Sequence, residues 1–280
     1  SGTSATWLDR RRGLMLSIAR PAETDERARV NSPHTDQSSA RSLGYRPDID
    51  GLRAVAVLSV LLYHAGVPPF FGGYVGVDVF FVISGYLITG IILSDIQAGR
   101  FTVAQFYERR VRRIFPALYL TVALTAAAAL LLFSPTDLEQ LFTSLVWLAF
   151  FASNFYFAEN SGYFDAAAEQ SAALHTWSLA IEEQFYVMFP ILLAVLWRYR
   201  ARVSTGWVLF AIATASLAFS VYAVDRDART AFFSTPGRVW ELMLGALLAV
   251  GFVPVIANRQ VRSAVATIGV AAIAGSLVLL

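Results

Sequence analysis

Long apolar stretches recur along this chain from residue 51 onward, and they decide which folds are open to it. Their approximate ranges are 51–68, 72–94, 115–133, 138–157, 177–197, 206–224, 238–253 and 263–280. A helix needs about 20 apolar residues to cross the hydrocarbon core of a bilayer, and most of these eight stretches approach that length. With 56% hydrophobic and 15% charged residues, the chain is too apolar for a soluble domain. The sequence therefore predicts an all-α, polytopic membrane helix bundle.

The arginines predict how this bundle is oriented. Residues 1–46 are polar and carry eight arginines against five acidic residues, so they are expected to form a disordered cytoplasmic tail. The transmembrane domain follows at 47–280. The loop at 95–114 and the cluster at 198–202 are also rich in arginine, which places both in the cytoplasm and predicts a multi-pass membrane protein with a cytoplasmic N-terminus.

The loop at 158–175 carries three acidic residues and no arginine, so it is expected outside the cytoplasm. This assignment conflicts with a simple alternation of sides if both apolar segments between 115 and 157 cross the membrane. One of the two is therefore expected to re-enter or to lie at the interface. The aromatic-rich stretch 141–157 is the candidate.

The first apolar segment, RPDIDGLRAVAVLSVLLYH (residues 46–64), holds an arginine near its start and a histidine at its end. Arg53 and His64 are eleven residues apart. At about 100° per residue they share one helix face, about 16.5 Å apart along the axis. Either residue alone fits an interfacial anchor, but two such side chains on one membrane-depth stripe favour a functional role.

Other apolar segments contain carboxylates, which at membrane depth must be paired, protonated or in contact with water. Asp78 is best explained by a hydrogen bond between packed helices. Arg238 and Glu241 are spaced i, i+3 and can form an ion pair, whose role stays open between structure and function. Glu182 and Glu183 favour function, and because they point about 100° apart, at most one is expected to face a given partner directly.

The run FYERRVRRIFPAL places four arginines in five residues just before a span: Arg109, Arg110, Arg112 and Arg113. One interpretation is an anchor of the positive-inside kind. Another is a site for a polyanion such as the diphosphate of coenzyme A, because arginine forks match phosphate oxygens. The two interpretations are compatible, since arginines that anchor a helix at the membrane surface can also bind a polyanion.

The chain has no cysteine and three histidines, His34, His64 and His175. Disulfides, thiolate nucleophiles and cysteine-based metal sites are therefore excluded, and no histidine-rich metal centre is expected. No nucleic-acid partner is expected either. The partners to consider are the lipid bilayer and whatever substrate reaches the intramembrane polar groups.

Several motifs in order resemble the bacterial membrane acyltransferase family 3 over residues 46–253. They are RPDIDGLRA with Arg53 and His64, GGYVGVDVFFVISGYLIT, FYERRVRRIFPA, SNFYF, and LHTWSLAIEEQFYVMFP. The resemblance implies a domain of about ten transmembrane helices that transfers an acyl group, acetyl first among the candidates, from cytoplasmic acyl-CoA. The implied acceptor is a hydroxyl of an extracytoplasmic glycan or glycolipid of the cell envelope, and the implied location is the bacterial inner membrane.

The resemblance also implies roles by position. Arg53 and His64 match the family's essential pair, and Arg110 and Arg113 match its Arg-x-x-Arg pattern, with Arg109 beside them for donor binding. Trp177 and Ser178 begin its Trp-Ser-Leu-x-x-Glu signature. The final helices, and the C-terminal SGNH-type domain found in many members, are not in this sequence. We therefore expect a truncated piece of a longer protein, and the acceptor's identity stays open.

For acyl transfer, His64 is the expected general base because histidine titrates near neutrality. Arg53 would bind the phosphates of coenzyme A or balance charge, and His175 would contact the acceptor or serve as a second histidine. We expect Arg53 and at least one of Arg110 and Arg113 at the inner mouth of one cavity. The wall of the same cavity would also include His64 and one glutamate, Glu182 or Glu183.

Two alternatives come from other classes. In a transporter or flippase, the intramembrane arginine, histidine and glutamates would form a substrate or proton pathway. The two halves of the sequence show no inverted repeat that would favour this alternative. A non-catalytic membrane scaffold would leave the buried polar residues unexplained.

Overall fold

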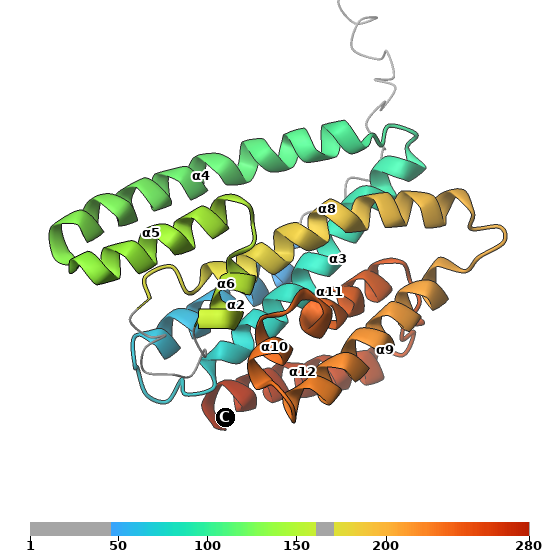
Figure 1. The fold of residues 1–280 in the computed structure, drawn as a ribbon. Coiled ribbons are helices and arrows are strands. Elements are labelled where there is room, and N and C mark those ends of the chain that lie inside the picture. Colours follow the sequence, from blue (N-terminus) through green and yellow to red (C-terminus); the bar gives the residue numbers. More distant parts are fainter. Residues whose placement is uncertain (1–45, 161–170, 280) are drawn as a thin grey trace, which may run out of the picture. The chain divides into compact units, whose positions relative to one another are not determined.

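The computed structural model describes residues 46–160 and 171–279, and within these ranges the chain is helical with no strand. The helices in order are α2 (Pro47–His64), η1 (Gly73–Val75), α3 (Gly76–Gln97), α4 (Val103–Leu132), α5 (Pro135–Ala149), α6 (Ser153–Asn160), α8 (Thr176–Arg198), α9 (Thr205–Val224), α10 (Ala228–Phe233), α11 (Thr235–Ala249) and α12 (Arg259–Leu279) (Figure 1). The all-α prediction is confirmed. The predicted tail at 1–46 lies outside the described residues except for Arg46, as do two of the three acidic residues of the 158–175 loop.

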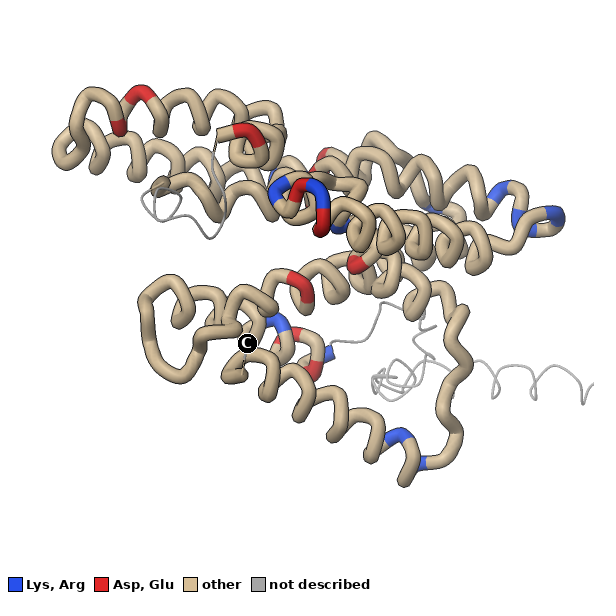
Figure 2. Tube along the Cα trace, turned by 60° about the horizontal axis from the view of Figure 1, so that its bottom comes forward, with Lys and Arg blue, Asp and Glu red and all other residues tan. Residues whose placement is uncertain are grey.

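Within the described residues, five stretches of helix are long and apolar enough to cross a membrane: Gly73–Gln97, which takes in η1 and α3, and the helices α4, α8, α9 and α12. The apolar stretches in α2, α5–α6 and α11 do not meet the same standard of length and hydropathy, so the predicted number of eight is not confirmed. Figure 2 shows that the charged residues gather at a few places along the trace, with long uncharged stretches of helix between them.

The apolar stretch predicted at 138–157 is broken into two helices. α5 ends at Ala149, and the chain turns at Phe150–Ala152, where Phe151 has a φ of 51°. Gln184, near the middle of α8, donates its side-chain N–H to the Phe151 carbonyl oxygen at 2.8 Å. The turn therefore lies beside the middle of α8, and α4 and α5 form a hairpin (Figure 1). The turn is compatible with the predicted re-entry of this stretch, which stays a prediction together with its interfacial alternative.

Helices α4 and α8 run antiparallel. Tyr107 of α4 donates its hydroxyl hydrogen to the carbonyl oxygen of Val187 in α8 at 2.5 Å, and one turn later Arg110 lies 3.6 Å from Glu183. Residue numbers rise along α4 as they fall along α8. The start of α4 therefore points toward the arginine-rich end of α8, but Arg110 lies beside the middle of α8, 15 residues or about 22 Å along the axis before Arg198.

Glycines allow α3 and α11 to pack with their backbones in contact. A Cβ atom added at Gly85 of α3 would collide with the carbonyl oxygen of Leu242, and one added at Gly245 of α11 would collide with the carbonyl oxygen of Val82. Small residues are used in this way at helix interfaces in membranes, where packing rather than hydrophobicity drives association. This contact holds α3 in place as a wall of the cavities described below.

Replacing Gly85 by alanine should destabilise the domain by about 1–3 kcal/mol, because the helices must separate to make room. The measurement is the melting temperature of the purified protein in detergent, followed by tryptophan fluorescence. Gly51→Ala is the matched control, since a Cβ atom there meets nothing within 4 Å. Equal melting temperatures for the two variants would contradict the close packing of α3 on α11.

Candidate active site

Helices α2, α3 and α8 and the first half of α4 enclose a cavity of about 440 Å³, here called the arginine cavity. Its charged wall residues are Arg53, Arg110, Arg113, Glu182 and Glu183. These five residues come from three separate segments. The sequence predicted that Arg53, at least one of Arg110 and Arg113, and one of the two glutamates would share a cavity. With three arginines against two glutamates, the wall carries an excess of positive charge.

Arg110 lies between the two glutamates of this cavity. Its Nη2 is 3.8 Å from Oε1 of Glu182, and its Nε is 3.6 Å from Oε1 of Glu183. The prediction that only one glutamate could face a given partner is wrong, because separate nitrogens of one guanidinium reach both. Tyr186 completes the group. Its ring centroid lies 3.7 Å from the guanidinium carbon of Arg110, and its hydroxyl donates to Glu182.

Arg53 and Arg113 are held less tightly than Arg110. Nη1 of Arg53 is 3.7 Å from a carboxylate oxygen of Asp50, whose side chain is half exposed. Arg113 forms no ion pair with any residue in the described ranges. Both guanidinium groups can therefore turn toward an anionic ligand in the cavity at little cost in lost protein contacts.

The other two arginines of the cluster do not line the cavity. Arg109 lies 2.8 Å from Asp95, which also binds Arg100 at 2.7 Å. Arg112 pairs with Glu108 at 2.7 Å on the exposed face of α4. Arg109 thus pairs across the loop between α3 and α4 and lies outside the cavity wall, so the structure does not support its predicted role in donor binding.

A second pocket of about 300 Å³, here called the histidine pocket, is lined by His64, His175 and Ser178 among mostly apolar residues. The ring centroids of His64 and His175 are 5.0 Å apart. The expectation of one cavity is therefore wrong in part, since His64 lies in a neighbouring pocket. Phe80 of α3 belongs to the walls of both.

The hydrogen bond of His64 fixes the tautomer of its neutral ring. Nδ1 is 2.8 Å from the carbonyl oxygen of Val60, which can only accept, so Nδ1 carries the proton. The basic lone pair is then on Nε2, as a general base requires. Burial and the neighbouring His64 lower the pKa of His175 below its usual value, so His175 is neutral at pH 7.

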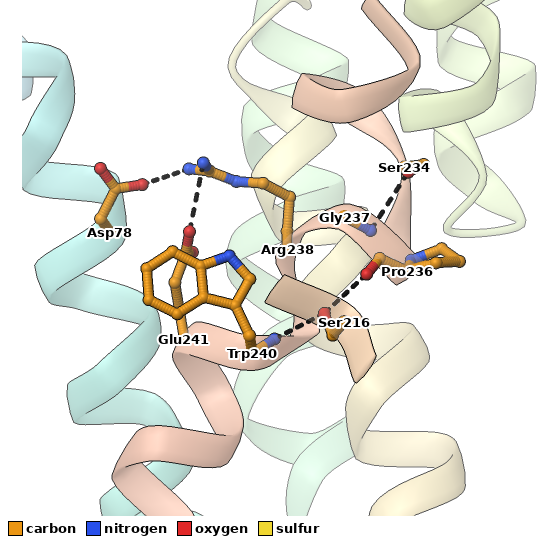
Figure 3. A network of polar contacts seen from close by, with 8 residues as sticks. All are labelled: Asp78, Ser216, Ser234, Pro236, Gly237, Arg238, Trp240 and Glu241. Atoms are coloured by element: carbon orange, nitrogen blue, oxygen red, sulfur yellow. Dashed lines mark hydrogen bonds and ion pairs between the residues drawn. The ribbon is translucent and has the colours of Figure 1, made fainter. Parts of the chain in front are cut away.

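Away from both cavities, Arg238 joins α11 to α3. Its Nη2 donates to Asp78 of α3, and its Nη1 lies 3.1 Å from Glu241 one turn along α11 (Figure 3). The predicted i, i+3 pair and the predicted helix-packing bond of Asp78 are both confirmed. Trp177, predicted as a supporting site residue, is buried with its ring centroid 5.7 Å from the Arg238 guanidinium carbon, so its place is in the core.

Residues 46–280 match the sequence model of the family Acyl_transf_3, described as an acyltransferase domain. The chain belongs to this acyltransferase family. It is 36% identical over 214 residues to a putative O-acetyltransferase of Staphylococcus aureus strain MSSA476, a match that covers 75% of this chain and 35% of the relative. It is also 33% identical over 242 residues to the O-acetyltransferase OatA of S. aureus strain NCTC 8325, covering 84% of this chain and 40% of OatA. No solved structure matches significantly.

The chain therefore spans less than half the length of these curated relatives. Membership of the acyltransferase family favours an enzyme over the transporter and scaffold alternatives. It also agrees with a multi-pass membrane domain. Among the described residues, no group of three histidine, aspartate or glutamate side chains is placed to hold a metal ion.

Sequence reasoning missed two residues of the site, Phe80 and Tyr186. Tyr186 lies four positions after Glu182, so helical spacing alone places it on the same face. Phe80 is one turn before Ser84 on the stripe of α3 that lines the arginine cavity. Nothing in its own sequence position distinguishes Phe80 from its neighbour Phe81, which is fully buried.

Arg238→Gln should destabilise the domain by about 3–5 kcal/mol, because it leaves the carboxylates of Asp78 and Glu241 without a cation in the interior. Arg112→Gln should change stability by no more than about 0.5 kcal/mol, since its ion pair is exposed. Melting temperatures of the two variants in the same detergent compare them directly. A small effect for Arg238→Gln would contradict its role in joining α3 to α11.

Proposed function

We propose that this protein is a membrane O-acyltransferase that moves an acyl group from acyl-CoA to a hydroxyl of a cell-envelope glycan or glycolipid. The observation that carries the proposal is the arrangement of three arginines and two histidines in adjoining cavities between the same helices. The names of the relatives favour acetyl as the group transferred and an oxygen as its acceptor. No metal enters the proposal.

The donor would bind at the arginine cavity. Arg53 and Arg113 would hold the phosphates of acyl-CoA, since paired guanidinium forks suit diphosphate oxygens. Arg110 would contribute positive charge while it remains between the two glutamates. Because the start of α4 points toward the arginine-rich end of α8, the arginine cavity would open toward the side predicted to be cytoplasmic, where acyl-CoA is found.

The chemistry would take place at the histidine pocket. His64 Nε2 would remove the proton of the acceptor hydroxyl as its oxygen attacks the thioester carbonyl carbon. A C–O bond forms, the C–S bond breaks, and the thiolate of coenzyme A takes the proton from His64. The neutral His175, 5.0 Å away between ring centroids, and Ser178 would contact the acceptor. The arm of coenzyme A would span the axial offset of about 16.5 Å between Arg53 and His64.

His64→Gln should lower acyl transfer by about 10²–10⁴-fold, because glutamine cannot accept the proton. The measurement is acetyl release from the envelope glycans of cells producing the full-length protein, after mild base treatment. His34→Gln is the control, since the proposal gives His34 no role. Near-normal acetylation by a well-expressed His64→Gln variant would contradict the general-base assignment.

Arg113→Gln should raise the KM for acyl-CoA about ten-fold with a smaller change in kcat, because one charge-assisted phosphate contact is lost. Arg112→Gln, one position earlier and paired outside the cavity, should leave the KM unchanged. Both variants are measured by release of the coenzyme A thiol from membrane vesicles. Equal KM values for Arg113→Gln and the unaltered protein would show that this arginine is an anchor alone.

A further inference from the structure

The arginine cavity and the histidine pocket share three helices, α2, α3 and α8, as walls. On α2, Arg53 lines the first and His64 the second. On α8, Glu182 lines the first and Ser178, one turn earlier, the second. The two spaces therefore lie end to end along one interface among α2, α3 and α8.

Phe80 is the one described residue found in both walls. One turn before it on α3, Val77 lines the histidine pocket alone, and one turn after it, Ser84 lines the arginine cavity alone. Phe80 is half-buried, so its ring lies at the boundary between the two spaces and not in the packed core.

We infer that Phe80 sets the size of the acyl group that the protein transfers, an inference that rests on the proposed function. A donor held by Arg53 and Arg113 has its acyl end pointing along the groove toward His64. That acyl group must pass the ring of Phe80 to reach Nε2 of His64. A small acyl group has room beside the ring, whereas a longer chain meets it. A hydrophobic wall discriminates about 10–200-fold per methylene group when the fit is tight.

The test uses the full-length protein in membrane vesicles, supplied in turn with acetyl-, propionyl- and butyryl-CoA. The rate of coenzyme A thiol release is measured against vesicles that lack the protein. The unaltered protein should prefer acetyl-CoA. Phe80→Ala should raise the butyryl-to-acetyl ratio of kcat/KM about ten-fold or more, and Phe80→Leu, which keeps more of the packing, should raise it less.

Leu87→Ala is the matched control. Leu87 is half-buried on the same helix and lines only the arginine cavity, so the ratio should stay within about two-fold of its original value. An unchanged ratio in both Phe80 variants, an equal rise in Leu87→Ala, or an unaltered protein indifferent to chain length would overturn the inference while leaving acyl transfer intact. Absence of thiol release above background from the unaltered protein with every donor would instead overturn the proposed function, and the inference with it.

Discussion

Two arginines each contact two carboxyl groups inside this bundle, and the walls of both cavities depend on them. Arg238 binds carboxylates on α3 and α11, and Arg110 lies between two glutamates of α8. Unpaired charges at such depth are costly, so each arginine fixes the separation and register of the helices that it joins. Helices α3 and α8 line both the arginine cavity and the histidine pocket. The contacts of Arg238 with α3 and of Arg110 with α8 therefore stabilise walls that the two cavities share.

This arrangement separates the charged and reactive parts of the site. In the proposed function, Arg53 and Arg113 would turn toward the phosphates of the donor at one end. Proton transfer would need a histidine with a defined tautomer, which the bond from His64 Nδ1 to a backbone carbonyl supplies at the other. The apolar boundary at Phe80 would keep the two apart, so that a charged donor enters at one end while only its acyl group reaches the base.

Much of this could be predicted from the sequence because helical periodicity is local. The stripe shared by Arg53 and His64, the pair of Arg238 with Glu241 and the helical class all follow from spacing. Spacing could not predict which of the clustered arginines line the cavity, since Arg113 shares a helix face with both Arg109 and Arg110. That choice depends on where Asp95 and Glu183 lie in the fold. The turn at Phe151, which ends α5, and the position of Phe80 at the boundary between the two cavities likewise depend on neighbours distant in sequence.

The most direct test of the central claim is a structure of the full-length protein bound to S-acetonyl-CoA, whose thioether cannot be cleaved. The account predicts that the diphosphate lies against Arg53 and Arg113, and that the ketone oxygen and carbon lie past Phe80, within reach of His64 Nε2. A complex in which the diphosphate sits at the histidine end, or in which the acetonyl group lies outside the groove among α2, α3 and α8, would contradict it.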